Sequence, residues 1–198
     1  MRENKVSQLL RRRRKLVTTD SNHKLKPSPN FLEQKFHCQT PNTVWLADIT
    51  YIDTDEGWLY LAGIKDMAKR EIVGWAMEDH MRAELCCEAL KMALGRRGPV
   101  PGLIHHSDRG SQYAGGKYRK LIGKAHLTQS MSRKGECLDN APMESVFASL
   151  KKNWCTASAL KRARRPRLLS LNTSRFSTTG SVGIPASATK HLYRLLKI

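Results

Sequence analysis

Three runs rich in β-branched and aromatic residues follow one another between residues 44 and 79. They are separated only by the turn Glu56-Gly57 and by the basic turn at 68–70, which are too short to hold a crossover helix. Consecutive strands joined so closely pair in the antiparallel sense, so the sequence predicts a three-stranded meander. The predicted strands are VWLADITYIDT (44–54), WLYLAGIKDM (58–67) and EIVGWAMED (71–79).

After residue 80 the pattern alternates between helix and strand. Apolar side chains at helical spacing predict helices at 82–97, 115–125 and 141–154, and short apolar runs predict strands at 102–107 and 127–132. In the last helix Met143, Phe147 and Leu150 share one face, Asp139 is a plausible cap and Pro142 fits the first turn. The order β-β-β-α-β-α-β-α predicts an α/β fold, a mixed five-stranded sheet flanked by helices.

The net charge of +18 is unevenly distributed. Residues 1–40 carry ten Lys or Arg against three Asp or Glu, residues 41–145 are balanced, and residues 146–198 carry eleven basic and no acidic side chains. Basic arms of this kind favour polyanions through counterion release, so the pattern favours a nucleic-acid partner over a merely soluble cationic tail.

Other compositional signals point to a protein of the cytoplasm. No apolar run approaches the ~18 residues that cross a bilayer, and the N-terminus lacks the apolar segment of a signal peptide. The five cysteines are odd in number and show no CxxC spacing, which is typical of reduced thiols. We therefore expect no membrane partner and a cytoplasmic, nucleoid-associated location.

Three carboxylates occupy unusual positions. Asp48 lies midway along the first predicted strand, where a charge is costly unless it has a task. Asp108 ends the fourth strand, and Glu144 lies in the first turn of the last helix, with 35 residues between it and Asp108. Carboxylates on neighbouring strand ends and an adjoining helix can hold two Mg²⁺ or Mn²⁺ ions roughly 4 Å apart for phosphoryl transfer.

A histidine metal site and two further aspartates are alternatives to this carboxylate site. His105 and His106 alternate across the fourth strand, so one is expected to pack inward and the other to face the cleft. A histidine metal site would need a third ligand at suitable spacing, which the sequence lacks. Asp66 and Asp139 are further carboxylates. A salt bridge to Arg70 is as plausible for Asp66 as catalysis.

The blocks WLADITYI, GWLYLA, IVGW, GLIHHSDRGSQYA and SMSRKGECLDNAPMES together resemble the catalytic frame of insertion-sequence transposases related to retroviral integrases. The resemblance covers residues 17 to about 154, because KLVTTDSNH also matches the lead-in of that family. It implies a ribonuclease-H-like fold and an Asp-Asp-Glu triad whose last two members are separated by 35 residues.

The resemblance assigns roles to individual residues. Asp48, Asp108 and Glu144 are expected to be catalytic and to bind two divalent metal ions, with no nucleotide cofactor. Lys151 resembles a basic residue that contacts the terminal DNA of the element.

Other DNA contacts are expected from the residues themselves. Ser130, Ser132, Arg133 and Lys134 form a polar, basic loop beside the triad that is expected to face DNA. Arg109 and Gln112 are candidate phosphate or base contacts, although an ordinary polar surface position is the default for both. The residues expected to contact DNA are Lys151, Arg109, Gln112, Arg133 and Lys134.

The family pattern stops after Trp154. Read one nucleotide back with permitted codons, NTSRFSTTGSVGIPASAT (172–189) can encode EYIEVFYNRQRRHSRLGY, which resembles the FYNxxRRHxxLGY motif that normally comes next in the family. We therefore predict a frameshift between about residues 151 and 161 and poor order past about residue 160. We also expect an N-terminal truncation, since the family usually carries helix-turn-helix segments upstream.

These observations predict three parts: a basic lead-in and linker (1–43), an integrase-type core (44–154) and an out-of-frame basic tail (155–198). The predicted function is metal-dependent DNA cleavage and strand transfer, by a homo-oligomer on DNA, with activity weakened by the altered tail. One alternative is an inactive DNA-binding fragment that inhibits intact transposase. A general ribonuclease-H-like nuclease is a further alternative, which the integrase-type blocks disfavour.

Overall fold

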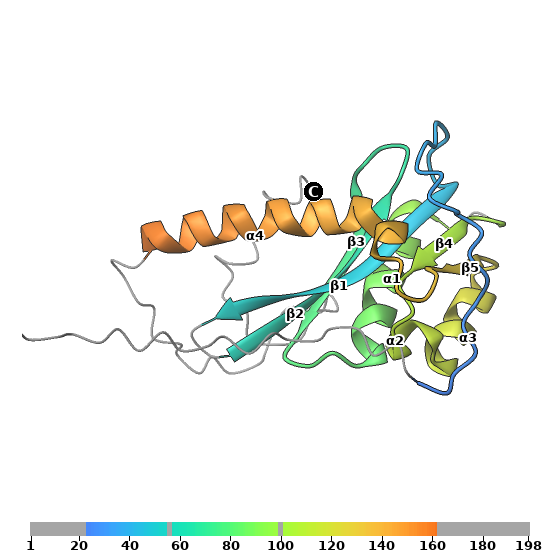
Figure 1. Ribbon diagram of the computed structural model, residues 1–198, viewed down its shortest axis with the longest axis horizontal. Coiled ribbons are helices and arrows are strands. Elements are labelled where there is room, and N and C mark those ends of the chain that lie inside the picture. The colour runs from blue at the N-terminus through green and yellow to red at the C-terminus, as the bar shows by residue number, and fades with distance from the viewer. Residues whose placement is uncertain (1–22, 55–56, 99–100, 162–198) are drawn as a thin grey trace, which may run out of the picture.

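A mixed five-stranded sheet organises the computed structural model, which describes residues 23–54, 57–98 and 101–161. The first three strands form the predicted antiparallel meander, and the last two join β1 in parallel, which gives the order β3-β2-β1-β4-β5 (Figure 1). The strands are β1 (Val44–Thr54), β2 (Gly57–Asp66), β3 (Ile72–Glu78), β4 (Ile104–Ser107) and β5 (Thr128–Met131).

Helices cover both faces of this sheet. The long helix α4 crosses one face, and the three shorter helices lie on the other (Figure 1). The predicted helices are all present, whereas the four-residue α2 is too short to show helical periodicity in the sequence. The helices are α1 (Ala83–Arg97), α2 (Ser111–Ala114), α3 (Gly116–Lys124), the 3₁₀ turn η1 (Cys137–Asn140) and α4 (Ala141–Lys161).

Alternation along β1 divides the core into two layers. Trp45, Ala47 and Ile49 pack with α1 and α3, whereas Leu46 and Ile52 pack on the opposite face with α4. Successive strand side chains point to opposite faces, so a single strand supplies both layers. The apolar side of α4 completes the second layer through the predicted residues, all of them buried: Met143, Phe147 and Leu150.

Gly74 of β3 permits the closest helix–sheet contact. A Cβ atom built there would lie 2.3 Å from the backbone oxygen of Ala89 and 2.7 Å from the backbone nitrogen of Ala93. Both atoms belong to the backbone of α1, so no side-chain rotation could relieve the overlap. The helix therefore rests directly on β3 because this residue has no side chain.

The end of the predicted lead-in packs against the core. Residues 23–36, here called the strap, run along the side of the molecule where β4 and β5 lie (Figure 1). The backbone N–H of Phe31 donates to Ser130 Oγ (2.9 Å), Met131 N–H donates to Pro29 O (3.2 Å), and Leu32 is buried in the α4 layer. The strap is thus a structural part of the core, although its sequence was expected to be linker.

Some predictions fall on residues outside the described ranges. The basic run at 11–15 is one such segment. The other is residues 162–198, which include most of the predicted out-of-frame tail. Helix α4 continues to Lys161, so its last residues overlap the start of the predicted tail. Over the described ranges, no helix has both the length and the apolarity needed to span a bilayer.

Both histidines of β4 are fully buried, so the expectation that one would face a cleft is wrong. His105 Nε2 and the Tyr118 hydroxyl form a 2.6 Å hydrogen bond, and Nδ1 has no hydrogen-bond partner among the described residues. Protonation would add a charge and a donor with no acceptor, and burial accordingly lowers the pKa of His105 to about 3. Burial also lowers the pKa of His106 to about 4.

We expect Gly74→Ala to destabilise the protein by roughly 1–3 kcal/mol, because the added methyl group overlaps the α1 backbone. Chemical denaturation monitored by tryptophan fluorescence measures this change. Gly95→Ala in α1 is the matched control, since a Cβ there meets no atom within 4 Å. That control should leave stability unchanged or raise it by up to about 1 kcal/mol. Equal effects of the two substitutions would contradict the packing argument.

We expect the two buried histidines to lower the free energy of unfolding as pH drops from 6.5 toward 4. Asp48 acts in the opposite direction, because burial raises its pKa to about 8, but it is one group against two. In this range the unfolded histidines bind protons while His105 and His106, with folded-state pKa values of about 3 and about 4, do not. Each can contribute up to about 1.4 kcal/mol per pH unit, and neither contributes above pH 6.5. Urea unfolding at several pH values should give a shallower dependence for His105→Asn. A pH dependence in His105→Asn as steep as that of the wild type would contradict this account.

Candidate active site

Parallel pairing of β1 with β4 places Asp48 and Asp108 at the same edge of the sheet. The last paired residues are Ala47 and Ser107, and the two aspartates come directly after them. The alternation of β1 directs Asp48 to the α4 face, since Leu46 packs there. Each carboxylate accepts a local backbone hydrogen bond, Asp48 Oδ1 from Ile49 N–H (2.7 Å) and Asp108 Oδ1 from Gly110 N–H (3.0 Å).

Gly110 lies in the turn that follows β4. Its backbone is in an ordinary extended conformation (φ −59°, ψ 144°), so the turn needs no left-handed residue there. A Cβ atom would instead lie 2.7 Å from Gln112 Oε1 and 3.1 Å from Asp108 Oδ1. The space beside Gly110 is therefore occupied by the Gln112 side chain and the Asp108 carboxylate.

Helix α4 brings Glu144 to the same edge. Gly63 is paired with Asp48 across β1 and β2, and a Cβ at Gly63 would lie 3.2 Å from Met143 Cε and 3.3 Å from Phe147 Cζ. The missing side chain lets α4 lie close to the sheet beside Asp48. Glu144, the neighbour of Met143, is exposed in the first turn of the helix.

Two buried polar side chains fix the start of α4 to the sheet. Asn140 Nδ2 donates to the carbonyl of Ala47 (3.0 Å), the residue that precedes Asp48. Lys65 Nζ, from β2, donates to the carbonyl of Pro142 (3.3 Å), and burial lowers the pKa of this lysine. Both donors act within four residues of Glu144, so they hold its helical turn against the strand that carries Asp48.

The electrostatics of Asp48 reflect this convergence. Burial raises the pKa of Asp48 to about 8, and the negative charges of Asp108 and Glu144 add to the increase. The backbone hydrogen bond from Ile49 and the positive charge of Lys151 act in the opposite direction. Three carboxylates near one another repel, and a bound cation would relieve that repulsion. Hard carboxylate oxygens are the ligands that Mg²⁺ and Mn²⁺ prefer, so the donor set fits the expected ions.

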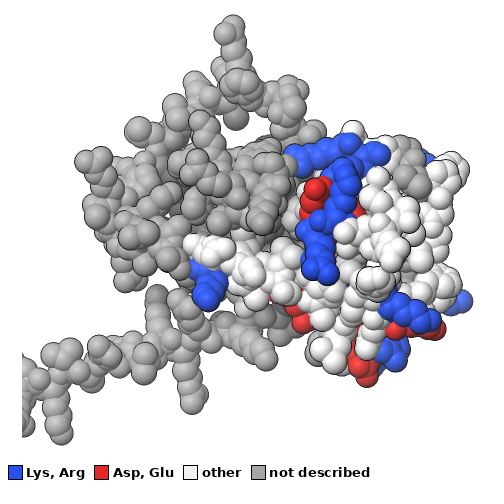
Figure 2. Space-filling view, turned by 90° about the horizontal axis from the view of Figure 1, so that it is seen from above, with Lys and Arg blue, Asp and Glu red and all other residues white. Residues whose placement is uncertain are grey.

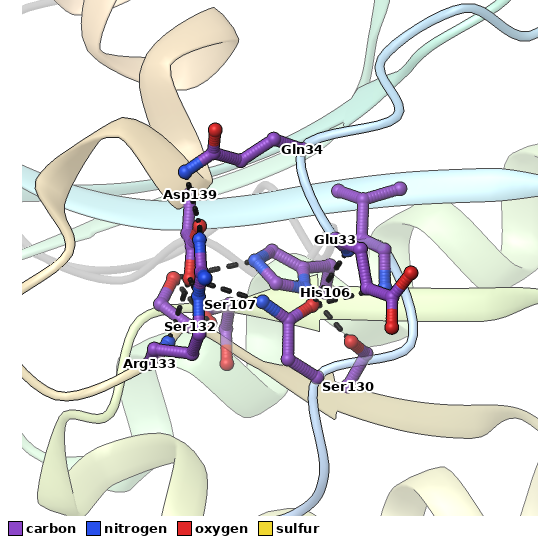
Figure 3. A network of polar contacts seen from close by, with 10 residues as sticks. Glu33, Gln34, His106, Ser107, Ser130, Ser132, Arg133 and Asp139 are labelled. Atoms are coloured by element: carbon purple, nitrogen blue, oxygen red, sulfur yellow. Dashed lines mark hydrogen bonds and ion pairs between the residues drawn. The ribbon is translucent and has the colours of Figure 1, made fainter.

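A second polar centre lies immediately before α4, around the fully buried Asp139 (Figure 3). Its carboxylate accepts hydrogen bonds from Asn30 Nδ2 (3.0 Å), Gln34 Nε2 (2.8 Å) and Arg133 Nη2 (2.9 Å), and also from Arg133 N and Nε. Its hydrogen bonds and ion pair with Arg133 hold the pKa of Asp139 well below its usual range. The interpretation of Asp139 as a helix cap is wrong, because its oxygens bind the strap and the preceding loop.

The loop serines expected to face DNA are buried. Ser130 Oγ lies 2.8 Å from His106 Nδ1, and Ser132 Oγ lies 3.3 Å from His106 Nε2 (Figure 3). Both ring nitrogens of His106 are thereby occupied by hydroxyl partners. This arrangement satisfies a buried polar ring and offers no histidine ligand to a metal ion.

Asp66 has a structural role, because its carboxylate binds backbone and side-chain donors near the ends of β1 and β2. Its buried carboxylate accepts hydrogen bonds from the backbone of Asn42 (2.7 Å) and Lys69 (2.9 Å) and from Trp45 Nε1 (3.3 Å). These contacts join the turn after β2 to the start of β1. They account for the charge at this position without a catalytic role.

The five residues expected to contact DNA lie in different environments. Lys151 is half-buried, and its Nζ lies 4.2 Å from the centroid of the Tyr51 ring. Gln112 is buried and its amide donates to Met81 O (3.2 Å), a position that favours packing. Arg133 keeps 56% of its side chain exposed while binding Asp139, Lys134 is exposed, and Arg109 is half-buried. The DNA contacts themselves stay predictions.

The α4 side of the molecule carries a band of Lys and Arg side chains beside a small acidic group (Figure 2). A basic surface beside clustered carboxylates suits a polyanion whose phosphates must approach acidic groups. Sequence reasoning found the carboxylates, but it missed Asn30, Gln34, Lys65 and Asn140. The only local signal was the pair Asp139-Asn140 directly before an amphipathic helix.

Comparison with known proteins agrees with this architecture. Residues 39–137, half of the chain, match the family model described as integrase core domain. An uncharacterized 31 kDa protein of insertion element IS600 from Shigella sonnei is 56% identical over 135 residues, which is 68% of this chain and 50% of that protein. Transposase InsF for insertion sequence IS3A from Escherichia coli is 50% identical over 129 residues, 65% of this chain and 45% of its own. The chain spans about half the length of these curated relatives.

Solved structures show the same fold at low sequence identity. A chain of the simian T-cell lymphotropic virus intasome, in complex with a PP2A regulatory subunit, has a TM-score of 0.58 at 13% identity, over 76% of this chain and 51% of its own. The HTLV-2 integrase catalytic core domain, solved with magnesium, has a TM-score of 0.53 at 15% identity, over 66% of this chain and 80% of its own. The sheet is thus ribonuclease-H-like, as predicted, and the chain belongs to the integrase core domain family.

Proposed function

We propose that this chain carries the catalytic core of a transposase, which cleaves DNA at an element end and joins the freed 3′ end to a second DNA. The observation that supports this most directly is the convergence of Asp48, Asp108 and Glu144 at one sheet edge, where burial and then the charges of the other two raise the pKa of Asp48. Membership of the integrase core family and the insertion-element relatives support the same reaction class.

In this proposal the three carboxylates hold two Mg²⁺ or Mn²⁺ ions. When bound, such ions supply the Lewis acid that activates an attacking oxygen and stabilises a leaving oxygen in phosphodiester transfer. The protein fixes the carboxylates on three rigid elements, β1, the end of β4 and the first turn of α4. Lys151, two helical turns after Glu144, would bind a DNA phosphate beside them and offset part of their negative charge.

We expect the chain to act as a homo-oligomer on DNA, with weakened activity. The alternative is an inactive fragment that binds DNA and inhibits intact transposase. The two functions differ in one property, since only the enzyme turns over DNA in the presence of a divalent cation.

We expect Glu144→Gln to reduce the rate of Mn²⁺-dependent cleavage of a duplex that carries an element end by at least about 100-fold. Loss of even outer residues around a metal site costs 10–100-fold, and this change removes a proposed ligand itself. Gel analysis of end-labelled duplex measures cleavage, and circular dichroism checks the fold. The control Glu136→Gln removes an exposed carboxylate from the loop before η1 and should retain activity.

A wild-type chain that binds the duplex without cleaving it would contradict the enzymatic proposal. Inhibition of intact transposase by the same chain would then establish the alternative. Cleavage that persists in Glu144→Gln would show that the triad is assigned incorrectly.

We expect Lys151→Gln to weaken DNA binding and to reduce its salt dependence. Each phosphate contact contributes about 0.9 to the slope of log K against log salt, so the slope should fall by about that amount. Fluorescence anisotropy with a labelled duplex at several salt concentrations measures it. Lys152→Gln is the matched control, because Lys152 is the exposed neighbour on the same helix. An unchanged slope for Lys151→Gln would remove this residue from the proposed interface.

A further inference from the structure

The Asp139 network joins three segments that are far apart in the sequence. Asn30 and Gln34 belong to the strap, Arg133 lies in the loop after β5, and Asp139 itself lies in η1, which leads directly into α4 (Figure 3). Every partner is a hydrogen-bond donor, so only an ionised carboxylate can serve all of them. The strap and the loop are therefore held to the base of α4 through one side chain.

The same segments reach both halves of the carboxylate site. Next to Asp139, Asn140 donates to the carbonyl of Ala47, adjacent to Asp48. At the other end of the strap, His23 Nε2 forms a 2.8 Å hydrogen bond with the carbonyl of Arg109, adjacent to Asp108. The three carboxylates repel one another, so their spacing depends on contacts of this kind outside the triad.

We propose that Asp139 is a positioning residue of the carboxylate site: by binding the strap and Arg133 it fixes η1 and the first turn of α4, so that Glu144 stays beside Asp48 and Asp108. This inference rests on the proposed function for its catalytic consequence. The positional part concerns the protein alone and is testable without DNA.

The test uses the full chain with Asp139→Asn, which keeps the size of the side chain but sets an amide NH₂ group against donors. We expect amide hydrogen exchange to accelerate about 10-fold at residues 145–148, the first hydrogen-bonded turn of α4, and within the strap. Exchange in β3 should be unchanged. Glu136→Gln, which removes an exposed carboxylate from the same loop, should leave all of these amides as in the wild type.

A second variant separates positioning from folding. Asn30→Ala combined with Gln34→Ala removes the strap side of the network and keeps the ion pair between Arg133 and Asp139. It should also accelerate amide hydrogen exchange at residues 145–148. If Asp139→Asn does not fold, this variant alone tests whether the Asp139 network positions the first turn of α4. Faster exchange in the strap alone, with the α4 turn unchanged in both variants, would overturn the proposal.

The catalytic consequence has its own readout. For Asp139→Asn we expect the Mn²⁺ concentration that gives half-maximal cleavage to rise at least about 10-fold, with the affinity for duplex DNA unchanged. A loss of DNA affinity with an unchanged Mn²⁺ requirement would overturn this role. If the wild-type chain does not cleave at all, the proposed function fails, while the exchange experiment still decides whether Asp139 positions α4.

Discussion

Mutual repulsion among three carboxylates is the constraint on which the rest of this structure depends. Asp48 lies where burial and two neighbouring negative charges raise its pKa to about 8, so the fold must hold these groups together against an electrostatic cost. It does so with backbone geometry. Parallel pairing of β1 with β4 fixes the two aspartates, and the close approach of α4 over Gly63 fixes the glutamate.

The polar contacts around the site are a consequence of that constraint. Lys65 and Asn140 are buried donors, and each binds a backbone carbonyl at the junction of α4 with the sheet. A buried polar group is costly unless it is paired, so such groups specify one arrangement of helix and strand. Ser130 and Ser132 do the same for His106 in the next layer of β4 and β5. These pairings favour one arrangement of α4, β4 and β5 around the carboxylates.

Much of this could be predicted from the sequence because it depends on local patterns. Alternating apolar residues locate β1, and the helical spacing of Met143, Phe147 and Leu150 identifies the buried face of α4. The order of strands and helices, with short turns between the first three strands, predicts the mixed sheet. Asp48 could be found because a charge midway along an apolar strand conflicts with its surroundings.

The remainder depends on long-range contacts that leave no local pattern. Asn30 and Gln34 lie more than 100 residues from Asp139 in sequence, so nothing in the strap indicated that it would dock. The loop containing Ser130 and Arg133 is polar and basic, which suggested an exposed DNA-binding surface. Instead its serines satisfy a buried histidine and its arginine binds a buried carboxylate. Polarity alone does not distinguish a solvated loop from one whose polar groups bind each other.

The buried apolar side chains of α4 precede the segment in which a frameshift is predicted. Over residues 141–153, where burial is described, the last buried α4 side chain is Leu150, which precedes the 151–161 window where the reading frame is predicted to change. The other groups that build the site also precede this window: the three carboxylates, Gly63, Asn140 and Asp139. A changed frame would therefore leave the codons of the site and its supports unaltered, and would alter only the later residues of α4 and the tail. Weakened activity would then come from lost assembly or DNA contacts beyond the core, with the carboxylate geometry intact.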